Sequence, residues 1–321
     1  MTVTVALAGD TMLGRKVAEA LSDAPPSALV SAQLVDAMRA ADLVVLNLEC
    51  CISERGRRWP ALGKPFFFRA PPRAVELLEL LGVTCVTMAN NHALDYGRQA
   101  LLDTLDHLAG VGIVAVGAGP DLARARRPAV LDTSGLRLAV VGVTDHPADF
   151  AAGPHHAGVA FADLRRGVPG WLGATVRDAA GLADAVLVSP HWGPNMTQVP
   201  PRYVQRAAGS LVEAGATLVA GHSAHVPHGV RDHILYDLGD FLDDYVVDPL
   251  LRNDLGLLFL LVLDRTGPIR LEAIPLKLGF CHTGLAAGSD AAWIRRRFHD
   301  ACAALGTEVS EVDGRLVVQW R

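Results

Sequence analysis

VTMANNHALDYG, the stretch from Val86 to Gly97, joins an apolar run to a cluster of amide and imidazole side chains. The run Val83 to Met88 has the length and composition of a buried β-strand. Asn90, Asn91 and His92 follow it directly and so lie at its carboxyl end, where open α/β sheets bind their ligands. We therefore expect part of a metal site here, although the same residue types also serve in ordinary turns.

Apolar runs of strand length recur along the chain and alternate with segments of helical periodicity. The predicted strands are Val3–Leu7, Leu43–Leu46, Val83–Met88, Ile113–Val116, Leu138–Val143, Ala185–Ser189 and Leu218–Ala220. The predicted helices are Val17–Leu21, Ala74–Leu81, Arg98–Ala109 and Tyr203–Glu213. This alternation predicts an α/β fold in which helices cover mixed or parallel sheets.

The last third of the chain has a different pattern. HILYDLGDF (233–241), LGLLFLLVLD (255–264) and IRLEAIPLKL (269–278) leave little room for helices and predict antiparallel strands. Further on, the sequence predicts a helix from Ser289, as its cap, to Ala304, and a hairpin that turns at Asp313-Gly314. We expect one metallo-enzyme domain over residues 1–285, with the C-terminal helix and hairpin of residues 286–321 packed on it.

Composition excludes several classes of partner. The chain has 321 residues, of which 50% are hydrophobic, and this is enough apolar material for a full core. Its net charge is -5, and it has no basic stripe that would bind nucleic acid. RRPAVL (126–131) and IRRRFH (294–299) are only local basic patches. No apolar run reaches the ~20 residues that span a bilayer, and no signal peptide is recognisable, so we expect a cytoplasmic protein without a membrane partner. Five cysteines without a CxxC motif indicate neither a disulfide framework nor a thiolate zinc site. The sequence predicts no oligomeric state.

Side chains of metal-ligand type follow several of the predicted strands. If these strands lie side by side, the loops converge on one sheet edge and bring together Asp10, Glu49, Asn91, His92, His191, His222 and His225. Carboxylates, an amide and imidazoles form a donor set for a divalent cation. Simpler roles are open for some of them: Asp10 as a helix cap, Glu49 as a buried ion-pair partner and His191 as a core imidazole. We expect His228 and His233 at the surface.

The ordered series GDTMLGR, NLEC, ANNHALDYG, SPHWGPN, GHSAH and YDLGDF resembles the capsule-synthesis (CapA, poly-γ-glutamate or PGA_cap) proteins, a branch of the calcineurin-like metallo-dependent phosphatase superfamily. The resemblance spans residues 3 to about 265. It implies a four-layer α/β/β/α sandwich with a metal site at the strand ends. It also implies that Asn91 binds metal and His92 meets the substrate, and that the remaining ligand positions are matched by Asp10, Glu49, His191 and the GHSAH histidines His222 and His225.

The sequence departs from the dinuclear phosphoesterases of this superfamily at three places. Asp10 is not followed by a histidine two positions later, Glu49 stands where an aspartate is usual, and GHSAH has a longer spacing than Gly-His-x-His. Two metal ions that act together on a phosphoester must both be held by protein ligands, so such a site needs a full ligand set. We therefore expect one divalent ion, Ca²⁺, Mg²⁺ or Mn²⁺, held partly through waters.

Imidazoles that do not bind metal are available as acids and bases. Asp95, three residues after His92, would orient the His92 ring if the segment turns helically, unless Asp95 caps the helix that begins near Gly97. A second pair would stand opposite, for which we take His225, with Asp240 or Asp145 as its partner; His191 is the other candidate for the imidazole of this pair.

Epimerisation removes a proton from one face of an amino-acid Cα and returns a proton to the other face. Two acid/base groups that face each other across a substrate carboxylate held by the metal would suit this reaction. The resemblance adds that capsule relatives are associated with a glutamate polymer and that one branch includes epimerases of lasso-peptide precursors. We predict a metal-dependent peptide epimerase. The alternatives are a hydrolase of a phosphoester or of a γ-glutamyl or cell-wall amide, and a non-catalytic capsule-assembly or peptide-binding protein.

Several loop residues are candidates for contact with a peptide substrate. KPFFFR (64–69) offers cations and aromatic surface for a carboxylate and an apolar side chain, although an edge strand with flanking charges fits it equally well. The predicted substrate contacts are Lys64, Arg69, Asp145, His146, Trp192 and Asn195.

Overall fold

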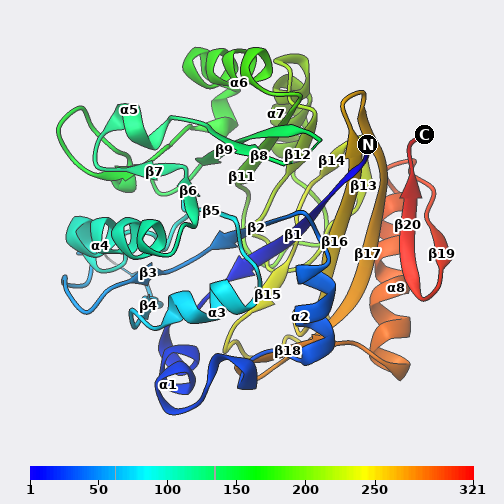
Figure 1. Ribbon diagram of the computed structural model, residues 1–321, viewed down its shortest axis with the longest axis horizontal. Coiled ribbons are helices and arrows are strands. Elements are labelled where there is room, and N and C mark those ends of the chain that lie inside the picture. The colour runs from blue at the N-terminus through cyan, green and yellow to red at the C-terminus, as the bar shows by residue number, and fades with distance from the viewer. Residues whose placement is uncertain (62, 134) are drawn as a thin grey trace.

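The structure is a computed structural model that describes residues 1–61, 63–133 and 135–321 (Figure 1). Its larger sheet contains, in spatial order, β19 (Ser310–Val312), β20 (Arg315–Gln319), β17 (Gly267–Gly279), β16 (Leu255–Asp264), β1 (Val3–Thr11), β2 (Leu43–Leu48), β5 (Cys85–Thr87) and β6 (Val114–Val116), with β15 (Asp240–Leu242) beside β1 and β18 (His282–Leu285) beside β17. The second sheet contains β13 (Val230–Arg231), β14 (Ile234–Leu235), β12 (Leu218–Ala220), β11 (Ala185–His191), β9 (Arg137–Thr144) and β8 (Ala129–Asp132). Two short pairs complete the strands: β3 (Cys51–Ile52) with β4 (Arg69–Ala70), and β7 (Ala118–Gly119) with β10 (Gly158–Val159).

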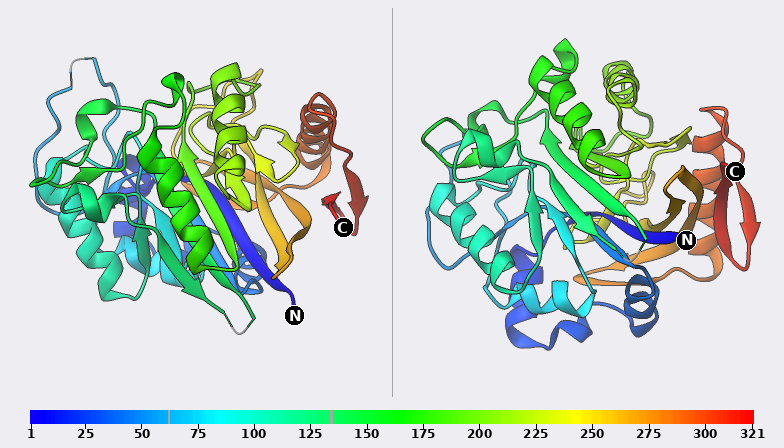
Figure 2. Two further views of the ribbon diagram at one scale, coloured as in Figure 1. Left: turned by 90° about the horizontal axis from the view of Figure 1, so that it is seen from above. Right: turned by 45° about the horizontal axis from the view of Figure 1, so that its top comes forward.

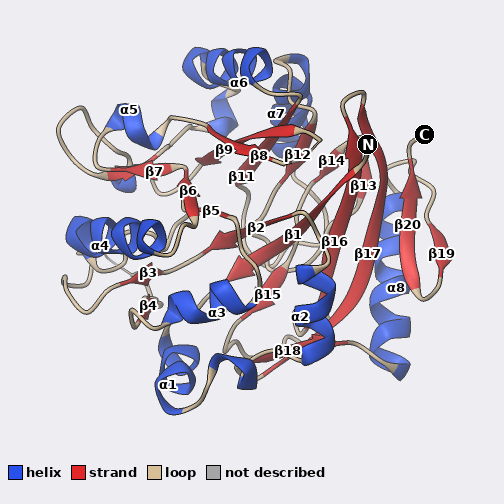
Figure 3. Cartoon of the chain, viewed as in Figure 1, coloured by secondary structure: helices blue, strands red, loops and turns tan. Residues whose placement is uncertain are grey.

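Helices cover the outer faces of both main sheets (Figures 2 and 3). The larger sheet is covered by α1 (Arg15–Asp23), α2 (Ala32–Arg39), α3 (Ala74–Leu80) and α4 (Gly97–Gly110). The second sheet is covered by α6 (Gly170–Leu182) and α7 (Arg202–Glu213). Of the remaining helices, α8 (Gly288–Ala303) packs on β16 and β17, and α5 (Leu122–Ala125) and the single turns Pro26–Ala28, Ala148–Phe150 and Leu164–Arg166 lie in connections. The fold is thus the four-layer α/β/β/α sandwich that the sequence predicts.

The side chains of the central strands point alternately to the core between the sheets and to the helices outside, which explains why the two sheets stack. In β1, Val5 and Leu7 enter the core between the sheets, whereas Ala6 and Ala8 face the helices. In β11, Leu187 joins the same inner core and Val186 packs under α6 and α7. Because successive side chains of a strand point to opposite faces, an apolar strand with both faces covered can serve two cores at once.

The seven predicted strands and four predicted helices are all present, and the antiparallel pairing of β16 with β17 is confirmed. The structure adds that β16 also pairs antiparallel with β1. The prediction for HILYDLGDF was wrong in detail. Its first part forms β14 in the second sheet and its last part begins β15, which runs parallel to β1. KPFFFR is not an edge strand either, since within it only Arg69 belongs to a strand, β4.

The C-terminal segment contains the predicted helix and hairpin. Asp313 and Gly314 have φ of 49° and 77°, the left-handed conformation that a two-residue hairpin turn requires. Ser289 does not cap α8, because this helix begins at Gly288 after an Ala287 cap. β20 pairs with β17, so the hairpin extends the larger sheet.

Candidate metal centre

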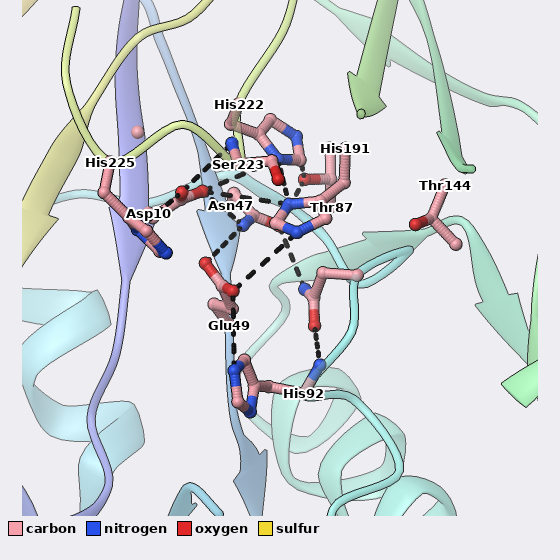
Figure 4. A network of polar contacts seen from close by, with 12 residues as sticks. Asp10, Asn47, Glu49, Thr87, His92, Thr144, His191, His222, Ser223 and His225 are labelled. Carbon is pink, nitrogen blue, oxygen red and sulfur yellow. Dashed lines mark hydrogen bonds and ion pairs between the residues drawn. The ribbon is translucent and has the colours of Figure 1, made fainter. Parts of the chain in front are cut away.

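The carboxyl ends of strands from both sheets meet at one place. In the larger sheet β1 and β2 run parallel; Asp10 is the second-to-last residue of β1, and Glu49 directly follows β2. In the second sheet β11 and β12 run parallel; His191 ends β11, and His222 follows β12. Figure 4 shows these side chains gathered in one cluster together with His225. Residues far apart in the sequence become neighbours because parallel strands present their carboxyl ends at the same edge.

Within the described residues, two groups of donors lie close enough to hold a metal ion. Asp10, His191 and His222 form one group, and Asp10, Glu49 and His225 form the other, each with ligand atoms within 4.8 Å of one another. His222 Nδ1 is 3.5 Å from Asp10 Oδ1, and His225 Nδ1 is 3.4 Å from Asp10 Oδ2. Asp10 belongs to both groups, so its two oxygens face different sets of imidazoles.

The residues of this centre fit a divalent cation. Asp10 and Glu49 are fully buried, and burial raises the pKa of both carboxyls, that of Glu49 further because Asp10 is beside it. Glu49 Oε1 and His191 Nε2 are buried 3.8 Å apart without a hydrogen-bond partner among the described residues. Burial lowers the pKa of His222 to about 3, so this imidazole is neutral and can offer a lone pair. Buried carboxylates with unpartnered oxygens are stabilised when a cation lies between them.

His92 lies at the edge of this centre and is bound to a carboxylate of its own. Its Nδ1 is 2.6 Å from Asp95 Oδ2, and its Nε2 is 3.9 Å from Glu49 Oε1. Burial lowers the pKa of His92 to about 4. Asp95 does not cap α4, because its Oδ2 accepts the Phe68 N–H at 2.6 Å and its Oδ1 lies 2.6 Å from Lys64 Nζ. The predicted contact between Asp95 and His92 is therefore present.

His225 has the second imidazole–carboxylate contact. Its Nδ1 lies 2.8 Å from Asp240 Oδ1, and burial lowers the pKa of this imidazole although Asp10 and Asp243 oppose the shift. Asp145 instead pairs with His146 and accepts the Tyr203 hydroxyl at 2.9 Å. Of the partners considered from the sequence, the structure thus brings Asp240 to His225.

The loop of GHSAH has an unusual backbone conformation. Ser223 and His225 have φ of 122° and 61°, values that side chains with a Cβ rarely adopt. Hydrogen bonds hold this conformation: Ser223 N–H donates to Asp10 at 3.1 Å and Ala224 N–H donates to Asp237 at 2.8 Å. Strain of this kind is concentrated at functional sites, where the surrounding structure fixes it.

Some of the supporting residues were not identified from the sequence. Asn47 donates to Asp10 at 2.7 Å and to Glu49 at 3.4 Å, and Thr87 lies 3.4 Å from His222. Asn47 precedes Glu49 by two positions in NLEC and so points to the same side of its strand, a spacing that could have indicated it. Asn90 donates to the Leu48 carbonyl and shapes the turn, as the sequence suggested.

A cavity of about 400 Å³ opens beside His92. The predicted residues that line it are Lys64, Asn91, His92, His146 and Asn195, with Phe66 and Phe150 as apolar walls. Asn91 reaches the cavity with a buried side-chain oxygen that has no hydrogen-bond partner among the described residues. The cavity therefore joins polar groups at the metal centre to an apolar surface.

Other predicted residues lie elsewhere. Trp192 is 2% exposed, packs in the core under α6 and α7, and donates its indole N–H to the Tyr236 carbonyl at 2.9 Å. Arg69 stacks over Tyr96 and lines a separate hollow with Glu54. His228 was expected at the surface, but it is 4% exposed because its ring packs inside and contacts the Thr197 carbonyl. Asp10 is no helix cap, since α1 begins at Arg15 with Gly14 as its cap.

A four-layer α/β/β/α sandwich with buried carboxylate and imidazole donors at the carboxyl ends of its strands defines a protein with a candidate metal centre. The chain belongs to the PGA_cap family, the bacterial capsule synthesis proteins, whose family model matches residues 4–245. A probable polyglutamine synthesis accessory protein of Mycobacterium tuberculosis is 33% identical over 286 residues, which cover 84% of this chain and 75% of the relative.

Two further comparisons differ in strength. The PGA biosynthesis protein CapA of Bacillus subtilis is 29% identical over 75% of this chain and 63% of its own length. A solved structure, TT1561 of Thermus thermophilus, covers 83% of this chain and all of its own with a TM-score of 0.44 and 12% identity, a similarity too low to carry a structural argument. Among the described residues, none of the helices has both the length and the apolar character needed to cross a membrane.

Proposed function

We propose that this protein is a metal-dependent acid/base enzyme that acts on a peptide, and that its reaction is epimerisation at an amino-acid Cα. One observation carries the proposal. His92 and His225 are both buried, each contacts a carboxylate of its own, and Figure 4 shows His225 beside Asp10 and His92 next to Glu49. A hydrolase needs one such group beside an activated water, whereas inversion at carbon needs two on opposite faces.

The pKa directions suggest which imidazole is the base. His92 has its pKa lowered to about 4 by burial, so it enters the reaction neutral and can accept the Cα proton at Nε2 while Asp95 accepts from Nδ1. Burial lowers the pKa of His225 as well, although Asp10 and Asp243 oppose the shift, so a proton that this imidazole takes from solvent is held next to those two carboxylates. His225 would then deliver a proton to the opposite face, and exchange with solvent would reset both rings.

Asp10, Glu49, His191 and His222 would hold the cation, and Asn91 could add its free oxygen. A divalent ion at these residues would supply positive charge that favours loss of the proton next to a carbonyl group.

The cavity beside His92 is consistent with a peptide residue. Phe66 and Phe150 offer apolar surface, and Asn91 and Asn195 are polar residues of the lining. The relatives' names refer to polyglutamine and PGA synthesis, that is, to chains of amide-linked residues. A substrate with backbone amides on both sides of the reacting carbon would suit both observations.

The proposal is tested with a peptide library incubated with the protein and Ca²⁺, Mg²⁺ or Mn²⁺ in D₂O. Epimerisation predicts that a peptide gains one deuteron while its covalent structure stays the same. His92→Ala should abolish this gain, and the matched variant His155→Ala, which changes an exposed loop histidine, should keep it. Peptides that are cleaved, or that exchange equally with His92→Ala, would falsify the proposed epimerisation.

A hydrolase is the second candidate. Asp10 belongs to both donor groups, and in a two-metal site one carboxylate could bridge the two ions in the same way. Elemental analysis decides between them. Two transition-metal ions per chain, together with turnover of bis(p-nitrophenyl) phosphate, would favour phosphoester hydrolysis. About one hard ion per chain, lost in Asp10→Ala and kept in His92→Ala, would favour the acid/base enzyme.

A further inference from the structure

A second hollow lies between helix α8 and two loops that leave the metal centre. We call it the α8 groove. Its volume is about 430 Å³, and its wall includes Val199, Leu250, Trp293, Arg296, Arg297 and Asp300. Two of these residues, Arg296 and Arg297, belong to the basic patch IRRRFH, for which the proposed chemistry has no use.

Two loops connect this groove to the metal centre. The first leaves β11 at His191, passes Asn195 in the cavity beside His92, and reaches Val199 in the groove. The second passes Tyr245, whose ring centroid is 5.3 Å from that of His225, and reaches Leu250 in the groove. The segment after β11 therefore lines both the cavity, at Asn195, and the groove, at Val199, whereas the second loop lines the groove and contacts His225 through Tyr245.

The rim of the α8 groove is apolar and exposed. Leu250 is 80% exposed and Val199 is 68% exposed, and Val246 on the same loop is 91% exposed. Their loops are nevertheless well held: Asp248 accepts the N–H groups of Leu250 and Leu251, and His228 contacts the Thr197 carbonyl at 2.8 Å. Apolar side chains presented on a fixed backbone are characteristic of an interaction surface.

The charge of the groove indicates what binds there. Among the described residues, Arg296 and Arg297 take part in no ion pair, whereas neighbouring Arg252 is held by both Asp254 and Asp290. Arg297 donates one N–H to the Leu251 carbonyl at 3.2 Å, and its other terminal nitrogen is buried without a partner in the described part of the chain. A planar guanidinium with free donors binds a carboxylate well.

We propose that the α8 groove binds the part of the peptide substrate remote from the reacting residue, and that it selects an apolar side chain next to an acidic one. The proposal rests on the proposed function in assuming a peptide. It adds a recognition site that is separate from the chemistry: the apolar side chain packs on Leu250, Val199 and Trp293, and the carboxylate pairs with Arg296 and Arg297.

The test uses an mRNA-display library of random linear peptides selected on the full protein in EDTA, so that metal chemistry plays no part. Enriched peptides are made with a fluorophore, and their Kd is measured by anisotropy. Arg296→Glu and Leu250→Asp should weaken binding about tenfold or more, as expected for residues at the centre of a contact. The matched variant Arg177→Glu, at an exposed position of α6, should bind like the parent.

The outcomes separate this inference from the proposed function. Binding that depends on Arg296 and Leu250 supports the groove even if no peptide exchanges deuterium. Enriched peptides that ignore both substitutions, or a selection that enriches nothing, overturn it. Self-association in analytical ultracentrifugation that Leu250→Asp abolishes would assign the groove to a second copy of the chain and also overturn the proposal.

Discussion

Asp95 is the side chain whose replacement tests the acid/base role of His92 most cleanly. It accepts the Phe68 N–H and contacts His92 Nδ1, so it fixes both the loop and the ring. In Asp95→Asn the side-chain amide can donate a hydrogen bond to Nδ1 of His92. The proton of the ring is then favoured on Nε2, the nitrogen that must be free to accept the Cα proton. We expect deuterium exchange at Cα to slow by about 10²- to 10⁴-fold, with metal content unchanged. Asp106→Asn on the exposed face of α4 is the control, and an Asp95→Asn rate equal to the parent's would contradict the role.

His228 makes a separate prediction about stability and pH. Burial lowers its pKa to about 4 from the ordinary value of 6.5, so the unfolded chain binds more protons than the folded one between these values. The stability that the neutral ring contributes is therefore complete above pH 6.5 and falls as the pH drops toward 4. Between pH 7 and pH 5 the loss from this group is roughly 2 kcal/mol.

Urea unfolding at pH 7 and pH 5 measures this loss. The other buried histidines also titrate, so the informative quantity is the difference between the parent and His228→Gln. We expect the variant to lose less stability on acidification than the parent by roughly 2 kcal/mol. Equal losses in both proteins would show that the ring is protonated without cost.

The location of a single site residue could be predicted from the sequence when the residue lies at the end of a predicted strand. Asp10, Glu49 and His191 were predicted to lie together because each comes at or after the end of an apolar run, and parallel strands place such residues at one edge. Trp192 and Arg69 were predicted as substrate contacts, but neither lines the cavity beside His92. The position of a residue next to a candidate site residue in the sequence does not fix the direction of its side chain, and Trp192, which follows the last residue of β11, turns into the core.

At the level of the strands, their existence could be predicted from the sequence, but the sheet that each strand joins could not. Strand existence was predictable from apolar runs, since strands buried on both faces are nearly continuous in Val, Leu and Ala. The separation of β14 from β15 was not, because HILYDLGDF crosses from one sheet to the other within a few residues. Nothing in a local pattern reports which sheet a short strand joins.

Helix α8 is expected to contribute to stability through one ring. Phe298 is 2% exposed, and its ring centroid is 5.8 Å from that of Phe259 in β16. We expect Phe298→Ala to lower the free energy of unfolding by about 3–5 kcal/mol, the range for a buried aromatic side chain. Phe280→Ala, at a position 70% exposed, should change it by less than about 0.5 kcal/mol. Chemical denaturation checks both, and similar small losses would mean that α8 is not part of the cooperative fold.

Over the molecule as a whole, the metal centre joins the two sheets, because Asp10 and Glu49 come from one and His191 and His222 from the other. An ion that binds only the folded state stabilises it, by about 2.7 kcal/mol at a concentration one hundred times its Kd. We therefore expect chelation to lower the Tm of the parent. Asp10→Asn should unfold at nearly the same temperature with or without chelator. Calorimetry checks this, and a parent Tm that ignores both metal and chelator would argue against a bound ion.

The contact between Ser223 and Asp10 also has a consequence for how the chain is made. This hydrogen bond joins positions 213 residues apart, and the histidines on either side of Ser223, His222 and His225, each belong to a donor group that includes Asp10. A ribosome releases the amino-terminal carboxylates long before it releases these imidazoles. Domains tend to fold as units during synthesis, so a growing chain would hold two buried acids without their partners until most of its length has emerged. Capture of the ion is then among the last events of biogenesis, and truncated chains should be recognisable in cell extracts by their lack of metal.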